Sequence, residues 1–343
     1  MPHDPDWKSH AGAALEKLSQ RRILIVGDLI IDEYVTCRPS HISLEAPIPV
    51  FYPLEGAVYL GGASNVAANV ASIDCRPLLL GLAGIQCAPG EIYGLGPEVL
   101  DRFRALCNDR GVELHAVEVP DRFFIRKRRY VADRQHVFRV DAVEESEAAP
   151  EYYDLMLTHA DRLLDSAGAL VVEEMGHGTV TPQVAQELIS RARKRGLPVM
   201  GDSQMGRLGW LKGCSLLCPN LKELRQACAE FCPQVSPDSS PEDAAQALRQ
   251  ALDLDAVLLK QGAQGMTLVD QNAAHKIPAV AVNVVDVTGA GDTVIAVIAS
   301  CLASGISMLQ AAHLANLAAA VAISKPGTST ASREELVHFL ESN

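Results

Sequence analysis

The sequence lacks three features that would each have pointed to a class of protein. It has no excess of basic residues, since its formal net charge is -12 over 343 residues, and nucleic-acid binders need a basic face for phosphate contacts. It has no apolar run of the roughly 18 residues that a membrane helix needs. It also has no Gly-x-Gly-x-x-Gly after its first apolar run, which argues against a dinucleotide-binding dehydrogenase. We therefore expect no nucleic-acid partner and no membrane span.

The cysteines form no disulfide framework. Their number, nine, is odd, and they lack the short, regular spacing of a disulfide scaffold, which favours reduced thiols in a cytosolic compartment. The pairs Cys214-x3-Cys218 and Cys228-x3-Cys232 are spaced poorly for a zinc site. Residues 1–20 are polar and lack the apolar core of a signal peptide. We expect a cytoplasmic protein whose cysteines are structural.

What the sequence does contain is a succession of apolar runs separated by helical patterns. Hydrophobic residues make up 48% of the chain, enough for the core of one large domain. The run Ile23–Val26 is continuous, as in a strand that is covered on both faces. After about residue 150 strand and helix patterns alternate. We predict an α/β fold, a doubly wound, mostly parallel sheet with helices on both faces, formed by residues 21–343 after a lead-in of residues 1–20.

Two stretches do not fit a parallel sheet. Residues 34–60 are punctuated by prolines and residues 112–140 alternate apolar and polar side chains, so both predict strands outside the main sheet. We assign them to a small β lid that could also contact a second copy of the chain. The second stretch contains Arg126-Lys127-Arg128-Arg129, which either binds a phosphate or carboxylate or is a solvated strand face.

Polar residues follow the first predicted strand and precede the first small-residue helix. Asp28 and Asp32 lie where open α/β sheets place their ligands, so they are candidates to bind substrate hydroxyls, although turn chemistry explains either one alone. The segment Gly61-Gly62-Ala63-Ser64-Asn65 leads into that helix. Asn65 offers a donor and an acceptor to a polyhydroxylated ligand, but a tight Gly-Gly turn explains the segment equally well.

The stretch with the most chemistry is Asp286-Val287-Thr288-Gly289-Ala290-Gly291-Asp292. A β-branched run, 280–287, leads into it and an apolar helical pattern follows it, which predicts a strand, a glycine turn and a helix. The amides of residues 289–291 would then face an anion at the helix N-terminus. Asp292 would lie in the first helical turn and take a proton from a hydroxyl group. A plain Asp-capped helix is the alternative.

Together, these two glycine segments resemble the signatures of the PfkB family, the ribokinase-like carbohydrate kinases. The resemblance extends from about Arg21 to Leu340. It implies an enzyme that transfers a phosphoryl group from ATP to a sugar hydroxyl, with Asp292 as the base and residues 289–291 as the anion hole. It also implies that Asp286 and Thr288 shape the nucleotide loop, where some members bind a monovalent cation such as K⁺.

A further segment resembles the family's magnesium–phosphate element. Pro219-Asn220-Leu221-Lys222-Glu223 is similar to Asn-Pro-Asn-x-x-Glu. The resemblance implies that Asn220 and Glu223 act on Mg²⁺, largely through bound water, which suits an ion that keeps several waters.

Three segments resemble the parts of the family that surround the nucleotide. Lys260-Gln261-Gly262-Ala263-Gln264-Gly265 is similar to the strand-end segment that lines ATP. Asn316 resembles a residue of the helix beside the adenine, and Gly327-Thr328 a loop that closes over the nucleotide.

Within the family, the chain resembles the subgroup that phosphorylates heptose 7-phosphate at C1 in ADP-heptose synthesis, which supplies the lipopolysaccharide core. The segment Ile42-Ser43-Leu44-Glu45-Ala46-Pro47-Ile48-Pro49-Val50 carries this likeness. Lys127 and Arg129 match a Lys-x-Arg lid element and would serve the substrate phosphate. By the same resemblance we expect a lid-mediated homodimer.

Two departures from the subgroup concern lysines. Glu173-Glu174-Met175-Gly176-His177-Gly178 stands in place of Ser-Asp-Tyr-x-Lys-Gly, and Asp202-Ser203-Gln204 in place of Asp-Pro-Lys. Two positive charges near the substrate or the phosphates are thus replaced by His177 and Gln204, which should weaken binding or change the substrate. Two alternatives therefore stay open: a kinase for another sugar, such as ribose or fructose, and a catalytically weakened pseudokinase that binds sugar or nucleotide.

Overall fold

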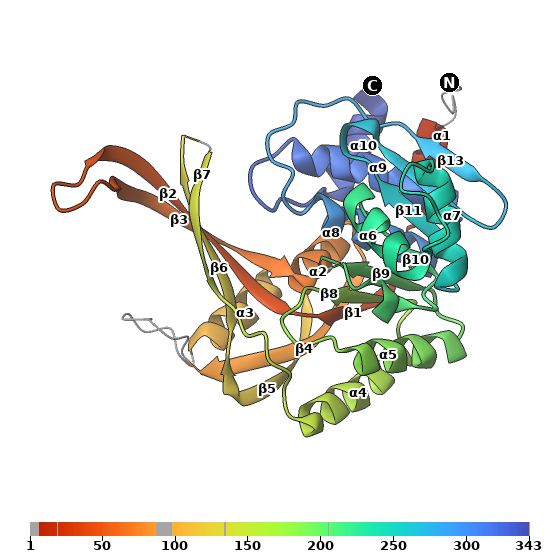
Figure 1. The fold of residues 1–343 in the computed structure, drawn as a ribbon, viewed down its shortest axis with the longest axis horizontal. Coiled ribbons are helices and arrows are strands. Elements are labelled where there is room, and N and C mark those ends of the chain that lie inside the picture. Colours follow the sequence, from red (N-terminus) through yellow and green to blue (C-terminus); the bar gives the residue numbers. More distant parts are fainter. Residues whose placement is uncertain (1–6, 19, 87–97, 134, 205, 343) are drawn as a thin grey trace.

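A nine-stranded sheet runs through the molecule (Figure 1). The computed structural model describes residues 7–18, 20–86, 98–133, 135–204 and 206–342. The strand order is β13-β12-β11-β10-β9-β8-β1-β4-β5. Neighbours from β11 to β5 are parallel, and β12 and β13 add antiparallel strands at one edge. The strands are β1 (Arg22–Gly27), β4 (Arg76–Gln86), β5 (Glu113–Phe123), β8 (Ala169–Glu174), β9 (Val199–Ser203), β10 (Leu216–Leu217), β11 (Ala256–Lys260), β12 (Met266–Val269) and β13 (Ala274–Ile277).

The central strand β1 explains why the apolar runs are continuous. Ile23 and Ile25 are buried in the core on one face of the sheet, and Leu24 and Val26 are buried in the core on the other. Because side chains alternate across a strand, a strand covered on both faces needs apolar residues at successive positions. The continuous run predicted as a strand is therefore confirmed as the middle of a two-sided sheet.

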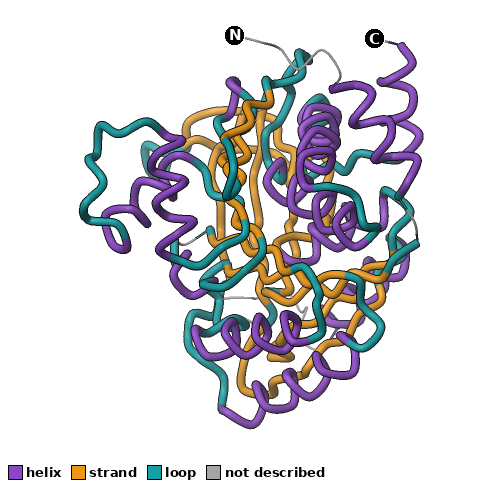
Figure 2. Tube along the Cα trace, turned by 90° about the vertical axis from the view of Figure 1, so that its right-hand side faces the viewer, coloured by secondary structure: helices purple, strands orange, loops and turns teal. Residues whose placement is uncertain are grey.

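Helices cover both faces of this sheet (Figures 1 and 2). The predicted doubly wound α/β fold is confirmed. None of the described helices is long and apolar enough to cross a bilayer. One face carries α1 (Trp7–Lys17), α2 (Ala63–Ser72), α3 (Glu98–Asp109), α8 (Ala290–Ala303), α9 (Met308–Ile323) and α10 (Arg333–Ser342), and the other carries α4 (Pro150–Leu164), α5 (Pro182–Lys194), α6 (Leu221–Phe231) and α7 (Pro241–Ala251).

A separate four-stranded sheet, which we call the lid, projects from the side of the molecule (Figure 1). Its order is β3-β2-β6-β7, formed by β2 (Leu29–Ile42), β3 (Pro49–Gly62), β6 (Ile125–Ala132) and β7 (Gln135–Ala142). β2 begins two residues after β1 ends, so the chain passes directly from the main sheet into the lid. The prediction of lid strands near residues 34–60 agrees with this arrangement.

The assignment of residues 112–119 to the lid was wrong. All of them except Val112 belong to β5, which pairs in parallel with β4 at the edge of the main sheet. The alternation that suggested a lid strand arises because an edge strand is only partly covered, so Val117 and Val119 are buried whereas Glu118 and Pro120 are exposed. The second lid segment is therefore the β6–β7 hairpin alone.

The strand expected directly before the glycine turn is also absent from the structure. Residues 280–287 form an irregular segment, and Val284, Val285 and Val287 are each at least half exposed. The amides of Val285 and Asp286 donate to the carbonyl oxygen of Ile323 at the end of α9, rather than to a neighbouring strand. β-branched residues favour a strand only where a partner strand is available.

Candidate active site

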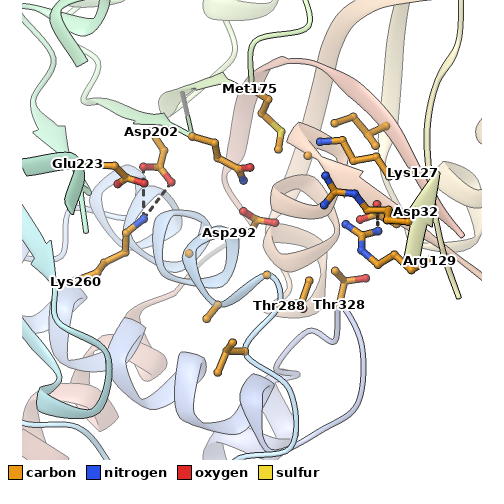
Figure 3. Close-up of a pocket in the computed structure, with 18 residues that line it drawn as sticks. Asp32, Lys127, Arg129, Met175, Asp202, Glu223, Lys260, Thr288, Asp292 and Thr328 are labelled. Atoms are coloured by element: carbon orange, nitrogen blue, oxygen red, sulfur yellow. Dashed lines mark hydrogen bonds and ion pairs between the residues drawn. The ribbon is translucent and has the colours of Figure 1, made fainter. Parts of the chain in front are cut away.

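A cavity of about 370 Å³ lies between the main sheet and the lid (Figure 3). One side is formed by the carboxyl ends of strands β8, β9 and β11 and by the start of α6. The opposite side is formed by lid strands β2, β6 and β7. Residues 287–292, at the start of α8, and Thr328 complete the wall. The cavity therefore lies at the edge where α/β sheets bind ligands.

The start of α8 depends on glycine. Gly289, the N-cap residue, has a φ of 81°, in the left-handed region that glycine adopts without strain. A Cβ atom on Gly289 would lie only 2.8 Å from Nδ2 of Asn65. The carboxylate of Asp286 accepts hydrogen bonds from the amides of Thr288 (2.9 Å) and Gly327 (3.1 Å). This aspartate thus joins the glycine turn to the loop that follows α9.

Asp292 lies in the first turn of α8 and lines the cavity, as predicted, and it is only 8% exposed. Nδ2 of Asn65 donates to its Oδ2 over 2.6 Å. Burial raises the pKa of Asp292 to about 7 against this hydrogen bond, and the carboxylate of Asp202 adds to the rise. A carboxylate with a pKa near neutrality can both accept and release a proton under ordinary conditions.

The contact between Asn65 and Asp292 is part of a network between α2 and α8. Asn69, one turn after Asn65, donates to the carbonyl oxygen of Asn65 (2.9 Å). The hydroxyl of Thr293 donates to Oδ1 of Asn69 (2.8 Å). All four side chains are buried. The network holds the Asp292 carboxylate in one orientation.

On the lid side, Asp32 forms a short ion pair with Arg129, 2.5 Å from Oδ1 to Nη1, and both residues line the cavity. Gly61 makes room for this pair, because a Cβ atom there would lie 2.7 Å from Oδ2 of Asp32. Lys127 and Arg139 also line the cavity from the lid. Burial lowers the pKa of Lys127. The lid therefore presents three basic side chains to the cavity.

Asn220 and Glu223 form a capping box at the start of α6. Oδ1 of Asn220 accepts from the amide of Glu223 (3.0 Å), and Oε2 of Glu223 accepts from the amide of Asn220 (2.8 Å). Glu223 also lines the cavity, and burial raises its pKa. Within the described residues there is no group of three or more His, Cys, Asp or Glu side chains that could hold a metal ion directly. This donor set suits a Mg²⁺ ion that is held mainly by phosphate oxygens and water.

The sequence of this chain matches the family described as pfkB family carbohydrate kinase over residues 20–335. The chain belongs to the PfkB family of carbohydrate kinases. As a member of this family, it is a phosphotransferase that acts on a sugar hydroxyl.

Curated relatives and solved structures agree with this family. The chain is 35% identical to the "Bifunctional protein HldE" of Bradyrhizobium diazoefficiens over 327 residues, and 35% identical to that of Paramagnetospirillum magneticum over 325 residues. Each alignment covers 94% of this chain but only 64% of the relative, so the chain spans about two thirds of the length of these bifunctional proteins.

Two solved kinases share the fold. They are phosphofructokinase-2 from Escherichia coli, with a TM-score of 0.72 and 18% identity, and ribokinase from Arabidopsis thaliana, with a TM-score of 0.68 and 20% identity. Both alignments cover 94% of this chain and 99% of the other. The ribokinase-like fold of this kinase is therefore established.

Of the residues predicted for the substrate, three do not line the kinase cavity: Gly61, Asn65 and Asp28. That aspartate is buried, and its carboxylate accepts hydrogen bonds from the amides of His177 and Thr179, both over 3.1 Å. Asp28 thus holds the distant loop that follows β8 instead of capping a turn in its own segment.

Six residues predicted for the nucleotide do not line the cavity: Asn220, Gly262, Gly265, Asp286, Asn316 and Gly327. Asn316 donates to the carbonyl oxygen of Pro278 over 2.7 Å. Gly262 and Gly265 have positive φ angles of 57° and 91° and shape the turn after β11.

Asp202 is a polar residue of the cavity that the prediction did not include. Asp202, at the end of β9, forms an ion pair with Lys260 (3.1 Å), and both line the cavity. Its position at the carboxyl end of a parallel strand is the signal that could have identified it. The hydroxyl of Thr328 is buried, lacks a hydrogen-bond partner among the described residues, and belongs to a side chain that lines the cavity. A buried polar atom of this kind suits contact with a ligand.

Glu173 is the first residue of the segment 173–178, which stands in place of the Ser-Asp-Tyr-x-Lys-Gly of the heptose kinase subgroup. It is fully buried next to this site. Neither of its carboxyl oxygens has a hydrogen-bond partner in the described part of the chain. Burial raises the pKa of Glu173 well above its usual range, and the carboxylates of Asp202 and Asp292 add to the rise.

His177, which stands in place of the lysine in the same segment of the subgroup, borders a second, small cavity together with Arg122. Its carbonyl oxygen accepts a hydrogen bond from Nη2 of Arg122 (2.8 Å), and burial lowers the pKa of its imidazole. Gln204, at the second departure, lines the main cavity.

Proposed function

We propose that this kinase transfers the γ-phosphoryl group of ATP to the C1 hydroxyl of heptose 7-phosphate, a step in the synthesis of ADP-heptose for the lipopolysaccharide core. The observation that carries the proposal is the distribution of positive charge around Asp292. In Figure 3, Asp292 lies between Lys260 on one side and Lys127 and Arg129 on the other. A site with cationic groups on both sides of its base suits two phosphates, one on the donor and one on the acceptor.

The relatives favour this acceptor. The HldE proteins, which combine a heptose 7-phosphate kinase with an ADP-heptose synthase, are 33–35% identical to this chain across nearly its full length. Lys127, Arg129 and Arg139 would hold the 7-phosphate under the lid. Asp32, Gly61, Gly62 and the backbone near Asn65 would meet the sugar hydroxyls. Asp28 would act through the loop that it holds at residues 177–179, without touching the sugar.

The chemistry would take place at the start of α8. Asp292 accepts the proton of the attacking hydroxyl, the hydroxyl oxygen forms a bond to the γ-phosphorus, and the bond from that phosphorus to the departing ADP oxygen breaks. The amide of Ala290 already donates to the carbonyl oxygen of Val287 (3.3 Å). We therefore assign the anion hole mainly to the amides of Gly289 and Gly291, aided by the helix dipole.

ATP would extend from the glycine turn across the ends of the strands. Lys260, Asp286, Thr288 and Thr328 would lie near its phosphates, while Gly262, Gly265, Asn316 and Gly327 would border its nucleoside. Asn220 and Glu223 would hold Mg²⁺ through water, and that ion would offset phosphate charge. A monovalent cation such as K⁺ would bind near Asp286. Because ATP is the donor, we place the enzyme in the cytoplasm.

We further propose that the lid forms a homodimer contact. The outer part of the β2–β3 hairpin exposes several large apolar side chains, and Leu44 at its turn is fully exposed. Large exposed apolar surfaces on a soluble domain often mark contacts with another protein. Such exposed residues on the lid are Ile42, Leu44, Ile48, Leu54, Phe138 and Val140.

The decisive experiment measures ATP consumption against heptose 7-phosphate, ribose, fructose and fructose 6-phosphate, with and without Mg²⁺. We expect Mg²⁺-dependent turnover with heptose 7-phosphate and phosphorus NMR of the product to show a phosphate at C1. Preferred turnover of another sugar would contradict the proposed acceptor. Binding of ATP and sugar without any turnover would instead support the pseudokinase alternative, which the replacements at His177 and Gln204 keep open.

A further inference from the structure

Lys260 lies against the first turn of α8. Its Nζ atom is 3.1 Å from Oδ2 of Asp202. The same atom would lie 3.2 Å from a Cβ atom built on Gly291. Because Gly291 has no side chain, the ammonium group approaches the backbone that forms the proposed anion hole. The ion pair bridges the ends of β9 and β11, on either side of the short strand β10.

The charges around the cavity make this lysine distinctive. Among the described residues, four basic side chains line the cavity: three come from the lid and the fourth is Lys260. On the side of the strand ends, the other ionisable residues that line it are the acids Asp202, Glu223 and Asp292. Without Lys260, no positively charged side chain among these lining residues would face an incoming triphosphate on that side.

The surroundings of Lys260 keep it charged. Burial opposes the charged form, but the nearby carboxylates, Asp202 above all, outweigh it, so the pKa of Lys260 lies above its ordinary value. Asp202 also limits where the ammonium group can point, because two of its oxygens lie within 3.4 Å of Nζ. A fixed, charged donor that costs no reorganisation during the reaction is the arrangement that stabilises a transition state.

We propose that Lys260 is a catalytic residue that donates a hydrogen bond to the γ-phosphoryl group during its transfer, and that Asp202 positions it. The proposal rests on the ATP-dependent transfer proposed above, but not on the identity of the sugar. Lys260 stays protonated throughout, while the hydroxyl proton goes to Asp292. Lys260 would thus supply the positive charge that is missing at Gln204, which lines the same cavity.

The first test compares Lys260→Met with Lys276→Met. Lys276, on β13 of the same sheet, forms an ion pair with Glu242 and does not line the cavity, so it is a matched control. We expect kcat to fall by ~10² or more in Lys260→Met, the usual cost of removing one preorganised donor. The control should retain the wild-type kcat. An unchanged kcat in Lys260→Met would overturn the proposal.

A second readout needs no sugar. Calorimetry of ADP and of a non-hydrolysable ATP analogue measures what the γ-phosphate adds to binding. We expect the wild type to prefer the analogue and Lys260→Met to lose about tenfold or more of this preference, as for a lost charged hydrogen bond. A preserved preference would overturn the proposal. Because no acceptor is present, this readout is independent of whether heptose 7-phosphate is the substrate.

Two further variants separate catalysis from folding. Lys260→Met could fail to fold because it leaves the buried carboxylate of Asp202 unpaired. The double variant Lys260→Met/Asp202→Asn removes both charges together. We expect this double variant also to lose the preference for the ATP analogue over ADP. Adding Gln204→Lys to Lys260→Met returns a cation to the same cavity. Partial recovery of kcat in Lys260→Met/Gln204→Lys would support a role of positive charge at the phosphates. If the neutral pair Lys260→Met/Asp202→Asn instead kept the wild-type preference for the ATP analogue over ADP, the proposal would be overturned.

Discussion

The two sides of the cavity are built differently. On the side of α8 and the strand ends, the polar groups are held by the core: Asn65 and Asp292 are 227 residues apart and both are buried in packed helices. On the lid side, long basic side chains extend from a sheet whose outer end is exposed. The difference suggests that the chemistry depends on rigid packing, and that the choice of acceptor depends on a few residues of an exposed element that can vary at little cost to the fold.

The largest effect should come from the packed side. Asp292→Asn should fold normally, because Asn at 292 can still accept the hydrogen bond from Asn65, but kcat should fall by ~10² or more without a base. Steady-state kinetics and circular dichroism check both statements. Near-native turnover would show that the packed side does not supply the base.

On the lid side, Lys127→Met should act on binding. We expect KM for a sugar phosphate to rise by about tenfold, the loss of one charged contact, with a small change in kcat and none in KM for an unphosphorylated sugar. The control is Arg128→Met, since Arg128 is the next residue of β6 but pairs with Glu33 (2.7 Å) and does not line the cavity. If both substitutions raised KM equally, the effect would not depend on whether a basic side chain of β6 lines the cavity, which would contradict the proposed role of Lys127.

The pH dependence of kcat/KM and of stability should report on Asp292, on the packed side of the cavity. Asp292 must be ionised to accept a proton, and its pKa is about 7, so kcat/KM should fall about tenfold per pH unit below that value. The folded state keeps this proton up to about pH 7, whereas the unfolded chain releases it near pH 4. The free energy of unfolding should therefore decrease between these values as pH rises. Thermal melts should show Asp292→Asn to be more stable than the wild type at pH 8, and a flat difference across this range would contradict the raised pKa.

The smallest catalytic effect should come from the outer end of the lid. Leu44→Glu places a charge on the exposed apolar surface and should convert a dimer to a monomer, as measured by light scattering, with only a few-fold change in turnover. Leu155→Glu, at an exposed apolar position on α4, is the control and should remain dimeric. A wild-type protein that is monomeric would contradict the proposed contact.

The sequence alone determined the elements that depend on local patterns. The continuous run in β1 predicted a strand covered on both faces, and the alternation after residue 150 predicted the doubly wound sheet. The glycine turn before Asp292 was also predictable, because Gly289 needs a left-handed backbone that few other residues adopt. The pattern of apolar residues and the backbone preference of glycine extend over a few residues, so a short stretch of sequence reveals them.

Only the tertiary structure decided which elements become neighbours. Half-buried strands look alike in sequence, so β5 could not be assigned to the main sheet rather than to the lid. The contact of Asn65 with Asp292, the pairing of Asp202 with Lys260 and the turn held by Asp28 join residues 58 to 227 positions apart. Such partners are set by how strands and helices pack, and no local pattern encodes them.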